Sequence, residues 1–168
     1  MPRAFVITGP SGVGKGTLIR GLMERVGERD GVDYHFLSRE EFDRLLAAGE
    51  FLEHADYAGN RYGTLRSELE QRLRAGHPVV LEIEVQGARQ VREAMPEVLQ
   101  VFIAPPSLDA LRARLTGRGT DDLEEVERRL RVAEGELAAQ PEFGHVVVND
   151  RLEEALEQLS EIVTRGLG

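Results

Sequence analysis

The chain has 168 residues, of which 41% are hydrophobic and 30% charged, and its formal net charge is −9. This length and composition predict a single globular domain with a sizeable core. The acidic balance argues against nucleic-acid binding, which needs a basic surface, but a nucleotide needs only a locally positive cleft. The lack of cysteine excludes disulfides, thiolate catalysis and thiolate zinc sites. The sequence has no apolar run of membrane-spanning length and no signal-peptide core at its N-terminus, so we expect a cytoplasmic protein that binds no membrane.

The most informative stretch follows the apolar, β-rich run 4–8. It is rich in glycine, and apolar residues recur at helical spacing directly after it, from Leu18 onward. Glycines allow backbone N–H groups to converge on an anion, and the start of a helix adds the positive end of its dipole. Lys15 supplies a mobile charge suited to the outer phosphates of a nucleotide. A glycine turn that merely links strand and helix is the simpler interpretation, but this context favours a nucleotide-binding loop. The predicted loop consists of Gly9, Pro10, Ser11, Gly12, Val13, Gly14, Lys15, Gly16 and Thr17.

The rest of the chain alternates between strand-like and helix-like patterns. The helix after the loop is expected to end at about Val26, with a polar turn at 27–31. Ser38 followed by Glu41 forms a capping box, which predicts a helix through about Ala48. The remaining predicted elements, in order, are strands at 34–37 and 51–57, a helix at 65–75, a strand at 79–85, a helix at 87–95, a strand at 98–103, a helix from Ser107, a glycine-flanked loop at 116–122, a helix at 123–137, a strand at 145–149 and a helix at 152–163.

This alternation predicts an α/β fold with a central parallel sheet and right-handed crossovers. The sheet is expected to contain the runs 4–8, 79–85, 98–103 and 145–149, with an inserted lobe between the first two. Ligands of such sheets bind beyond the carboxyl ends of the strands. Glu82 and Glu84 project to one face at such an end, where water, metal or ligand would have to meet them; the alternative is an edge strand with one wet face.

Eight sequence blocks carry a resemblance to a known family. In chain order they read Gly-Pro-Ser-Gly-Val-Gly-Lys at 9–15, Asp-Tyr-His-Phe at 33–36, Gly-Glu-Phe-Leu-Glu at 49–53, Gly-Asn-Arg-Tyr-Gly-Thr at 59–64, Leu-Glu-Ile-Glu-Val-Gln-Gly at 81–87, Phe-Ile-Ala-Pro-Pro-Ser at 102–107, Arg-Gly-Thr at 118–120 and Val-Asn-Asp at 148–150. Together they resemble the guanylate kinases, which are P-loop nucleoside monophosphate kinases. The resemblance implies one three-layer α/β/α domain with a core at 1–30, 76–112 and 130–168, a GMP-binding lobe at 31–75 and a lid at 113–129.

The same resemblance implies transfer of the γ-phosphoryl group of ATP to GMP, giving ADP and GDP, with Mg²⁺ as cofactor. The loop 9–17 would then bind ATP. A monomer or a small homo-oligomer is expected. Two alternatives stay open at this stage. One is another P-loop nucleoside monophosphate kinase, because the Gly-Lys-Gly-Thr run also resembles the adenylate kinase loop. The other is a kinase-dead module that binds phosphorylated protein segments; such modules typically lose the loop lysine and the lid arginines, both of which this chain keeps.

Five residues match positions that bind GMP in the family. Glu53 matches a carboxylate that accepts hydrogen bonds from the adjacent N1–H and 2-amino donors of guanine. Thr64 resembles the hydroxyl residue that contacts O6, and Glu84 stands where the family usually has an aspartate at the guanine. Tyr34 and Tyr62 resemble the tyrosines that hold the GMP phosphate; packing within the lobe is the alternative for both.

The remaining matches concern ATP and the transfer step. Lys15, Arg114, Arg118 and Arg129 match the catalytic lysine and the lid arginines, which neutralise phosphate oxygens. Without the resemblance, these arginines would be interpreted as solvated surface charges. The predicted metal contacts, direct or through water, are Thr17 and Glu82, and the predicted adenine-bordering turn is Asn149 and Asp150.

The chain departs from the family at two places, and the larger departure, in addition to Glu84 in place of aspartate, follows the first helix. Guanylate kinases carry a core strand and a Thr-x-Arg-x-x-Arg type segment after the first helix, and this segment supplies a serine and two arginines to the GMP phosphate. Here Val26 is followed directly by Gly27. Either the segment is truly absent or residues are missing from this sequence, in which case a break is expected between Val26 and Gly27. We favour the second explanation, because a sheet lacking that strand would expose apolar edges.

Overall fold

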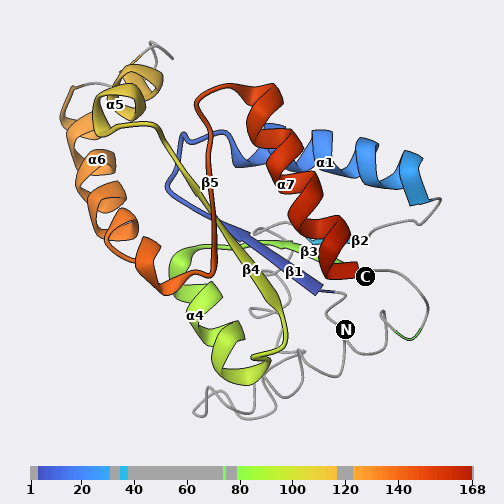
Figure 1. The fold of residues 1–168 in the computed structure, drawn as a ribbon. Coiled ribbons are helices and arrows are strands. Elements are labelled where there is room, and N and C mark those ends of the chain that lie inside the picture. Colours follow the sequence, from blue (N-terminus) through green and yellow to red (C-terminus); the bar gives the residue numbers. More distant parts are fainter. Residues whose placement is uncertain (1–3, 31–34, 38–73, 75–78, 117–122, 168) are drawn as a thin grey trace.

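The computed structural model describes residues 4–30, 35–37, 74, 79–116 and 123–167. Five parallel strands form one sheet in the order β2-β3-β1-β4-β5 (Figure 1). The strands are β1 (Ala4–Thr8), β2 (His35–Leu37), β3 (Val79–Glu82), β4 (Leu99–Ala104) and β5 (His145–Val148). The helices are α1 (Lys15–Asp30), α4 (Val85–Ala94), α5 (Leu108–Thr116), α6 (Leu123–Leu137), the short 3₁₀ helix η1 (Gln140–Glu142) and α7 (Leu152–Leu167). In this part of the chain, no helix combines the length and the apolarity needed to cross a membrane.

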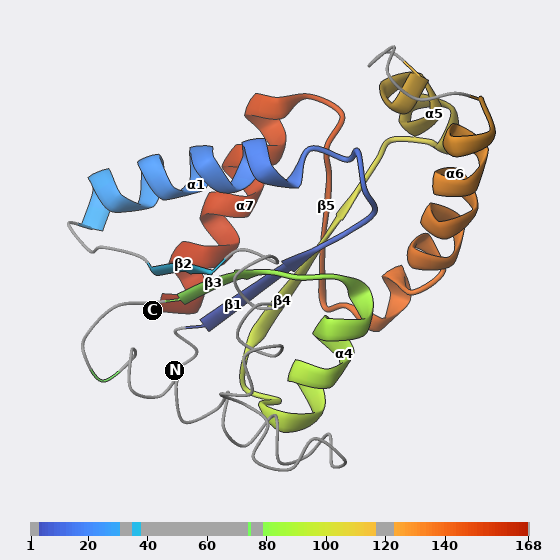
Figure 2. The same cartoon turned by 180° about the vertical axis from the view of Figure 1, so that it is seen from behind.

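Helices cover both faces of the sheet, which confirms the predicted three-layer arrangement. α1 and α7 lie on one face and α4 on the other, as the two opposite views show (Figures 1 and 2). Arg25 of α1 joins α7 through ion pairs of 2.9 Å to Glu153 and 2.8 Å to Glu157. α5 and α6 pack on each other through a separate group of buried side chains, which are Leu111, Leu115, Val126, Leu130 and Ala133.

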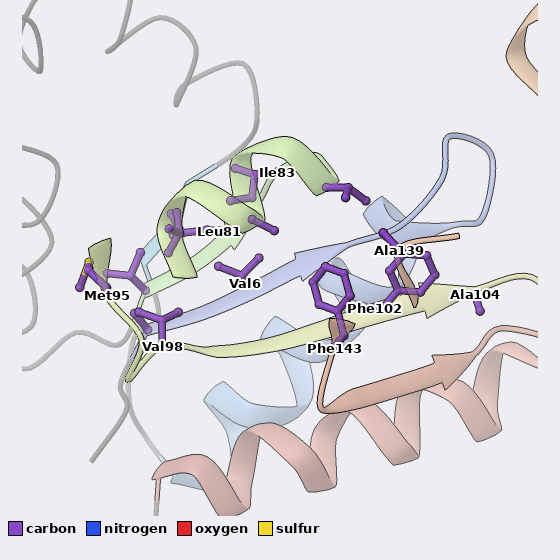
Figure 3. Close-up of a cluster of buried hydrophobic side chains, with 14 residues drawn as sticks. Val6, Leu81, Ile83, Met95, Val98, Phe102, Ala104, Ala139 and Phe143 are labelled. Carbon is purple, nitrogen blue, oxygen red and sulfur yellow. The ribbon is translucent and has the colours of Figure 1, made fainter. Parts of the chain in front are cut away.

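The alternation of side chains along β1 explains the two main cores. Phe5 and Ile7 belong to the cluster under α1 and α7, whereas Ala4 and Val6 belong to the cluster under α4. All five residues of β1 are buried, as expected for a central parallel strand covered on both faces. Figure 3 shows the α4-side cluster, in which Phe102 and Phe143 lie beside each other with ring centroids 5.3 Å apart.

The first helix is longer than the sequence pattern predicted. α1 continues through Gly27 to Asp30, so the predicted end at Val26 and the polar turn at 27–30 are wrong. A single glycine inside a helix disfavours it by only about 1 kcal/mol, and the glutamate and arginine that follow are good helix formers. The chain passes from Val26 to Gly27 inside this helix.

The sheet has one more strand than predicted. The run 35–37, which the sequence analysis assigned to the inserted lobe, pairs in parallel with β3, with Phe36 opposite Val80. β3 and β4 are the neighbours of β1, and β2 pairs with the other edge of β3. The other predicted elements of the lobe, at 38–48, 51–57 and 65–75, and the loop at 117–122 lie outside the described residues, Arg74 excepted.

The third predicted strand is shorter than expected. β3 ends at Glu82, and α4 already begins at Val85, with Glu84 as its N-cap residue in an extended conformation. The N–H of Ile83 still donates to the carbonyl of Ile7, at 3.3 Å, and α4 starts two residues later. Glu82 and Glu84 are therefore not two residues of one strand, and the inference that they share a strand face is wrong.

Candidate phosphate-binding site

The loop between β1 and α1 adopts a backbone that requires glycine. Gly9, Gly12 and Gly14 have φ angles of +149°, +86° and +95°, which side chains on L-residues rarely allow. The carbonyl of Gly14 accepts the N–H of Leu18 at 3.1 Å, so the loop passes directly into α1. The first amides of this helix and the positive end of its dipole therefore lie at the loop, as an anion site requires.

Close contacts with the neighbouring elements fix the position of the loop. A Cβ atom on Gly9 would lie 2.3 Å from the carbonyl oxygen of Ile103, and one on Gly12 would lie 2.8 Å from Cδ2 of Leu115. The loop thus packs against the backbone of β4 and the side chains of α5 without room for a methyl group.

Lys15 lies against this loop and lines a pocket of about 390 Å³. Its Nζ donates a hydrogen bond of 2.5 Å to the carbonyl oxygen of Gly9. The pocket is bounded by the loop, by the start of α4 and by α6. Its lining residues are Ser11, Lys15, Glu84, Val85, Gln86, Arg89, Val132, Gly135 and Glu136.

Two of the three predicted lid arginines reach the loop. Arg129 of α6 donates from Nη2 to the hydroxyl oxygen of Ser11 at 2.7 Å. Arg114 of α5 donates to two main-chain carbonyls, that of Val13 at 3.2 Å and that of Asn149 at 2.8 Å. Arg118 lies outside the described residues.

Asn149 directly follows β5 and is buried, with 6% of its surface exposed. Its side-chain Nδ2 donates to the carbonyl of Val13 at 2.8 Å, and its own N–H donates to the carbonyl of Ala104 at 2.8 Å. Asp150, which comes next, is exposed. The predicted adenine-bordering turn therefore lies directly against the phosphate loop.

The predicted acidic and hydroxyl contacts, Glu82, Glu84 and Thr17, differ in their surroundings. Glu84 lines the pocket together with Lys15. Glu82 is half-buried at the carboxyl end of β3, level with Ile7 of β1. Thr17 is exposed, and its hydroxyl accepts a long hydrogen bond of 3.4 Å from Nη2 of Arg20. The predicted GMP contacts Tyr34, Glu53, Tyr62 and Thr64 lie outside the described residues.

Arg89 and Glu136 line the pocket, although the sequence analysis did not single them out. Arg89 lies one turn into α4 and makes two hydrogen bonds, of 2.9 and 2.7 Å, to the carboxylate of Glu142. The hydrogen bonds from Arg89 lower the pKa of the Glu142 carboxyl, and those to Glu142 raise the pKa of the arginine. Arg89 follows Gln86 by three residues and Glu136 follows Val132 by four. Helical spacing therefore places each of them beside another residue that lines the pocket.

The parallel sheet, the glycine loop after its central strand and the lysine at the start of the next helix define a P-loop kinase. Solved structures agree with this class. A guanylate kinase from Anaplasma phagocytophilum superposes with a TM-score of 0.61 at 31% identity, covering 96% of this chain and 84% of that one. A shikimate kinase from Bacteroides thetaiotaomicron shares the fold, with a TM-score of 0.58 at 16% identity and coverage of 96% and 98%.

The particular family follows from sequence similarity. A profile of the family described as guanylate kinase matches residues 23–165. The guanylate kinase of Streptomyces coelicolor is 51% identical over 174 residues, covering 94% of this chain and 88% of that protein. That of a Synechococcus strain is 51% identical over 173 residues, with coverage of 94% and 92%. The chain belongs to the guanylate kinase family.

Proposed function

We propose that this chain transfers the γ-phosphoryl group of ATP to GMP, giving ADP and GDP in guanine nucleotide recycling. The observation that carries the proposal is a pocket lined by Lys15 and by Ser11 of the glycine loop, with Arg129 hydrogen-bonded to Ser11, in a member of the guanylate kinase family. Phosphoryl transfer requires mainly alignment of the reactants and neutralisation of their charge, and these groups supply both.

The loop amides and the α1 dipole bind the ATP phosphates, and Lys15 leaves the carbonyl of Gly9 to contact the outer phosphates. Arg129 and Arg118 neutralise the charge that spreads over the transferred group. Arg114 supports the loop through its contacts with the carbonyls of Val13 and Asn149. No side chain has to act as a strong general base, because the bond to the leaving phosphate is largely broken before the new bond forms.

For GMP, we assign the guanine contacts to Glu53, Thr64 and Glu84 and the phosphate contacts to Tyr34 and Tyr62. Of these, Glu84 supports the assignment by its place in the pocket beside Lys15. We further propose that the lobe comprises most of 31–75, beyond β2, and that the lid spans about 113–129 and closes over bound nucleotides.

Mg²⁺ is the cofactor that such a reaction uses, and the residues present fit it. Thr17 offers a hydroxyl and Glu82 a carboxylate, which are the hard oxygen donors that Mg²⁺ prefers. Among the residues that the structure describes, no group of three or more His, Asp or Glu side chains could hold a metal by itself. This suits an ion held mostly by water and nucleotide phosphates, with Thr17 and Glu82 in contact directly or through water. When bound, Mg²⁺ neutralises phosphate charge. We also propose a cytoplasmic location and a monomer or small homo-oligomer.

The test is Lys15→Ala, compared with Arg165→Ala on the exposed C-terminal turn of α7. Transfer to GMP should fall by at least about two orders of magnitude for Lys15→Ala, while the melting temperature stays near that of the parent. Arg165→Ala removes the same charge far along the chain and should leave the rate unchanged. A folded Lys15→Ala variant with a rate within a few-fold of the parent would contradict the proposal, and preference for AMP, CMP or UMP in the parent would assign another monophosphate substrate.

A further inference from the structure

The carbonyl group of Val13 accepts hydrogen bonds from two separate donors. Nδ2 of Asn149 lies 2.8 Å from this oxygen and Nη1 of Arg114 lies 3.2 Å from it. Val13 itself is fully buried, so its carbonyl needs these partners in place of water. Asn149 and Arg114 come from β5's end and from α5, which lie far from Val13 in the sequence.

The direction of this carbonyl fixes the direction of the next amide. A trans peptide is planar, and its C=O and N–H bonds point to opposite sides. With the Val13 oxygen directed at Asn149 and Arg114, the N–H of Gly14 is directed away from them. Gly14 is the last loop residue before α1, where backbone amides of a phosphate-binding loop face their anion.

Gly14 lies so close to the side chain of Asn149 that no larger residue fits in its place. A Cβ atom on Gly14 would lie 2.7 Å from Nδ2 of Asn149, in addition to the strain of its φ of +95°. Asn149 is in turn fixed to β4 by its N–H bond of 2.8 Å to Ala104 and by the bond of 2.8 Å that its carbonyl accepts from Arg114. If the side chain of Asn149 or the Val13–Gly14 peptide rotated, a buried polar atom would be left unpaired, so both are held in place.

We propose that Asn149, assisted by Arg114, is a positioning residue that orients the Val13–Gly14 peptide so that its N–H faces the ATP phosphates. This inference rests on the proposed function, because it names what one assigned ATP residue does. Asn149 then acts on phosphate binding through the loop and not by touching the adenine, and Arg114 supports the loop instead of clamping the transferred group.

The experiment compares Asn149→Asp with a matched control, Gln100→Glu. Both changes replace a buried amide that donates to a main-chain carbonyl by a carboxylate; Gln100 donates to Ala88 at 2.9 Å, away from the loop. ADP binding is measured by calorimetry, and the KM values for ATP and GMP by a coupled assay. Asn149→Asp should weaken ADP at least about tenfold and raise the KM for ATP with little change in that for GMP, because one amide no longer faces the phosphates. Gln100→Glu should leave both nucleotides unaffected at a comparable melting temperature.

Adenosine binding separates the proposed role from a contact with adenine. Loss of ADP affinity with adenosine affinity retained supports the inference, whereas equal loss of both would overturn it in favour of an adenine contact. An Asn149→Asp variant that binds ADP as the parent does would also overturn it. Should that variant not fold, Asn149→Ala removes the donor without adding a charge, and the same outcomes decide. A parent that fails to phosphorylate GMP yet loses ADP affinity on this change would refute the proposed function alone.

Discussion

At the scale of single residues, guanine selection should depend on the carboxylate of Glu53. Guanine presents two adjacent donors, and the amide of Glu53→Gln would place a donor against one of them. Mismatched buried polar groups are disfavoured by about 1–3 kcal/mol each, so GMP should bind about 5- to 150-fold more weakly. ATP should bind as it does to the parent. Calorimetry with each nucleotide measures this; equal weakening of both would mean that Glu53 supports the fold and not the base.

Some site residues could be predicted from the sequence because their signal is local. The positive φ angles at Gly9, Gly12 and Gly14 follow from a glycine-rich turn between a strand and a helix. The contact of Arg114 with Val13 could not be predicted in the same way, since 101 residues separate the two. Side-chain spacing reports which face of a helix is apolar, but it does not report which distant backbone group a guanidinium meets.

At the scale of helices, replacing either of two glycines inside a helix by alanine should change the stability of the fold in opposite directions. A Cβ atom added to Gly135 in α6 would meet nothing within 4 Å among the residues that the structure describes, whereas one on Gly21 in α1 would lie 2.7 Å from Cδ2 of Leu156 in α7. Alanine favours a helix by about 1 kcal/mol over glycine, so Gly135→Ala should raise the free energy of unfolding by about 0.5–1 kcal/mol.

Gly21→Ala gains the same helix preference but crowds the contact between α1 and α7. Overpacking a core destabilises it by about 1–3 kcal/mol, so this variant should be less stable than the parent. Urea unfolding of the two variants side by side makes the comparison. A gain in stability for Gly21→Ala equal to that for Gly135→Ala would show that α1 and α7 are packed less tightly than the structure indicates.

The contact between α4 and η1 should weaken in acid. Hydrogen bonds from Arg89 hold the pKa of the Glu142 carboxyl below its ordinary value of 4.5. A carboxyl whose pKa is lowered by folding stabilises the fold above its ordinary pKa, and this contribution is lost as the pH falls through the folded pKa. Glu142→Gln should therefore lower the melting temperature slightly at pH 7, because the pair is exposed, and the difference should vanish in stronger acid.

Thermal unfolding between pH 7 and pH 3 measures this difference, and an Arg89→Gln background supplies the control. Without its main donor, Glu142 should stabilise the fold less, so the same Glu142→Gln change should have little pH dependence there. If Glu142→Gln lowers the melting temperature of the parent by the same amount at pH 7 and at pH 3, the ion pair is not the cause of that change.

At the scale of the whole molecule, the alternating pattern predicts the order of most elements because each strand and helix buries its own apolar face. β1 was predicted with its observed bounds, and β4 and β5 within one residue at each end. The pairing of β2 with β3 was not predicted, because three residues carry too little periodicity to distinguish a sheet edge from a lobe. The continuation of α1 through Gly27 was missed because a glycine beside polar residues also indicates a turn.

GMP should bind weakly to a chain that passes from Val26 to Gly27 within one helix. In the family, two arginines of the segment that follows the first helix neutralise the GMP phosphate. Charge-assisted hydrogen bonds contribute about 1.5–3 kcal/mol each. A chain without both arginines should therefore bind GMP at least about a hundredfold more weakly than a chain that has them. ATP should bind normally, because Lys15 and the loop amides, to which we assign its phosphates, are in place.

Insertion of a strand and Thr-x-Arg-x-x-Arg type segment, as the family carries it, between Val26 and Gly27 tests this directly. The insertion should raise GMP affinity at least about a hundredfold and leave ATP affinity unchanged, since it returns only the charges that face the GMP phosphate. A glycine–serine insertion of equal length controls for the interruption of α1. If the present chain already binds GMP as tightly as the variant with the inserted segment, other cations must hold the phosphate. Arg29 and Arg61 are then the residues to replace, because Arg29 follows the junction closely in the sequence and Arg61 directly precedes Tyr62.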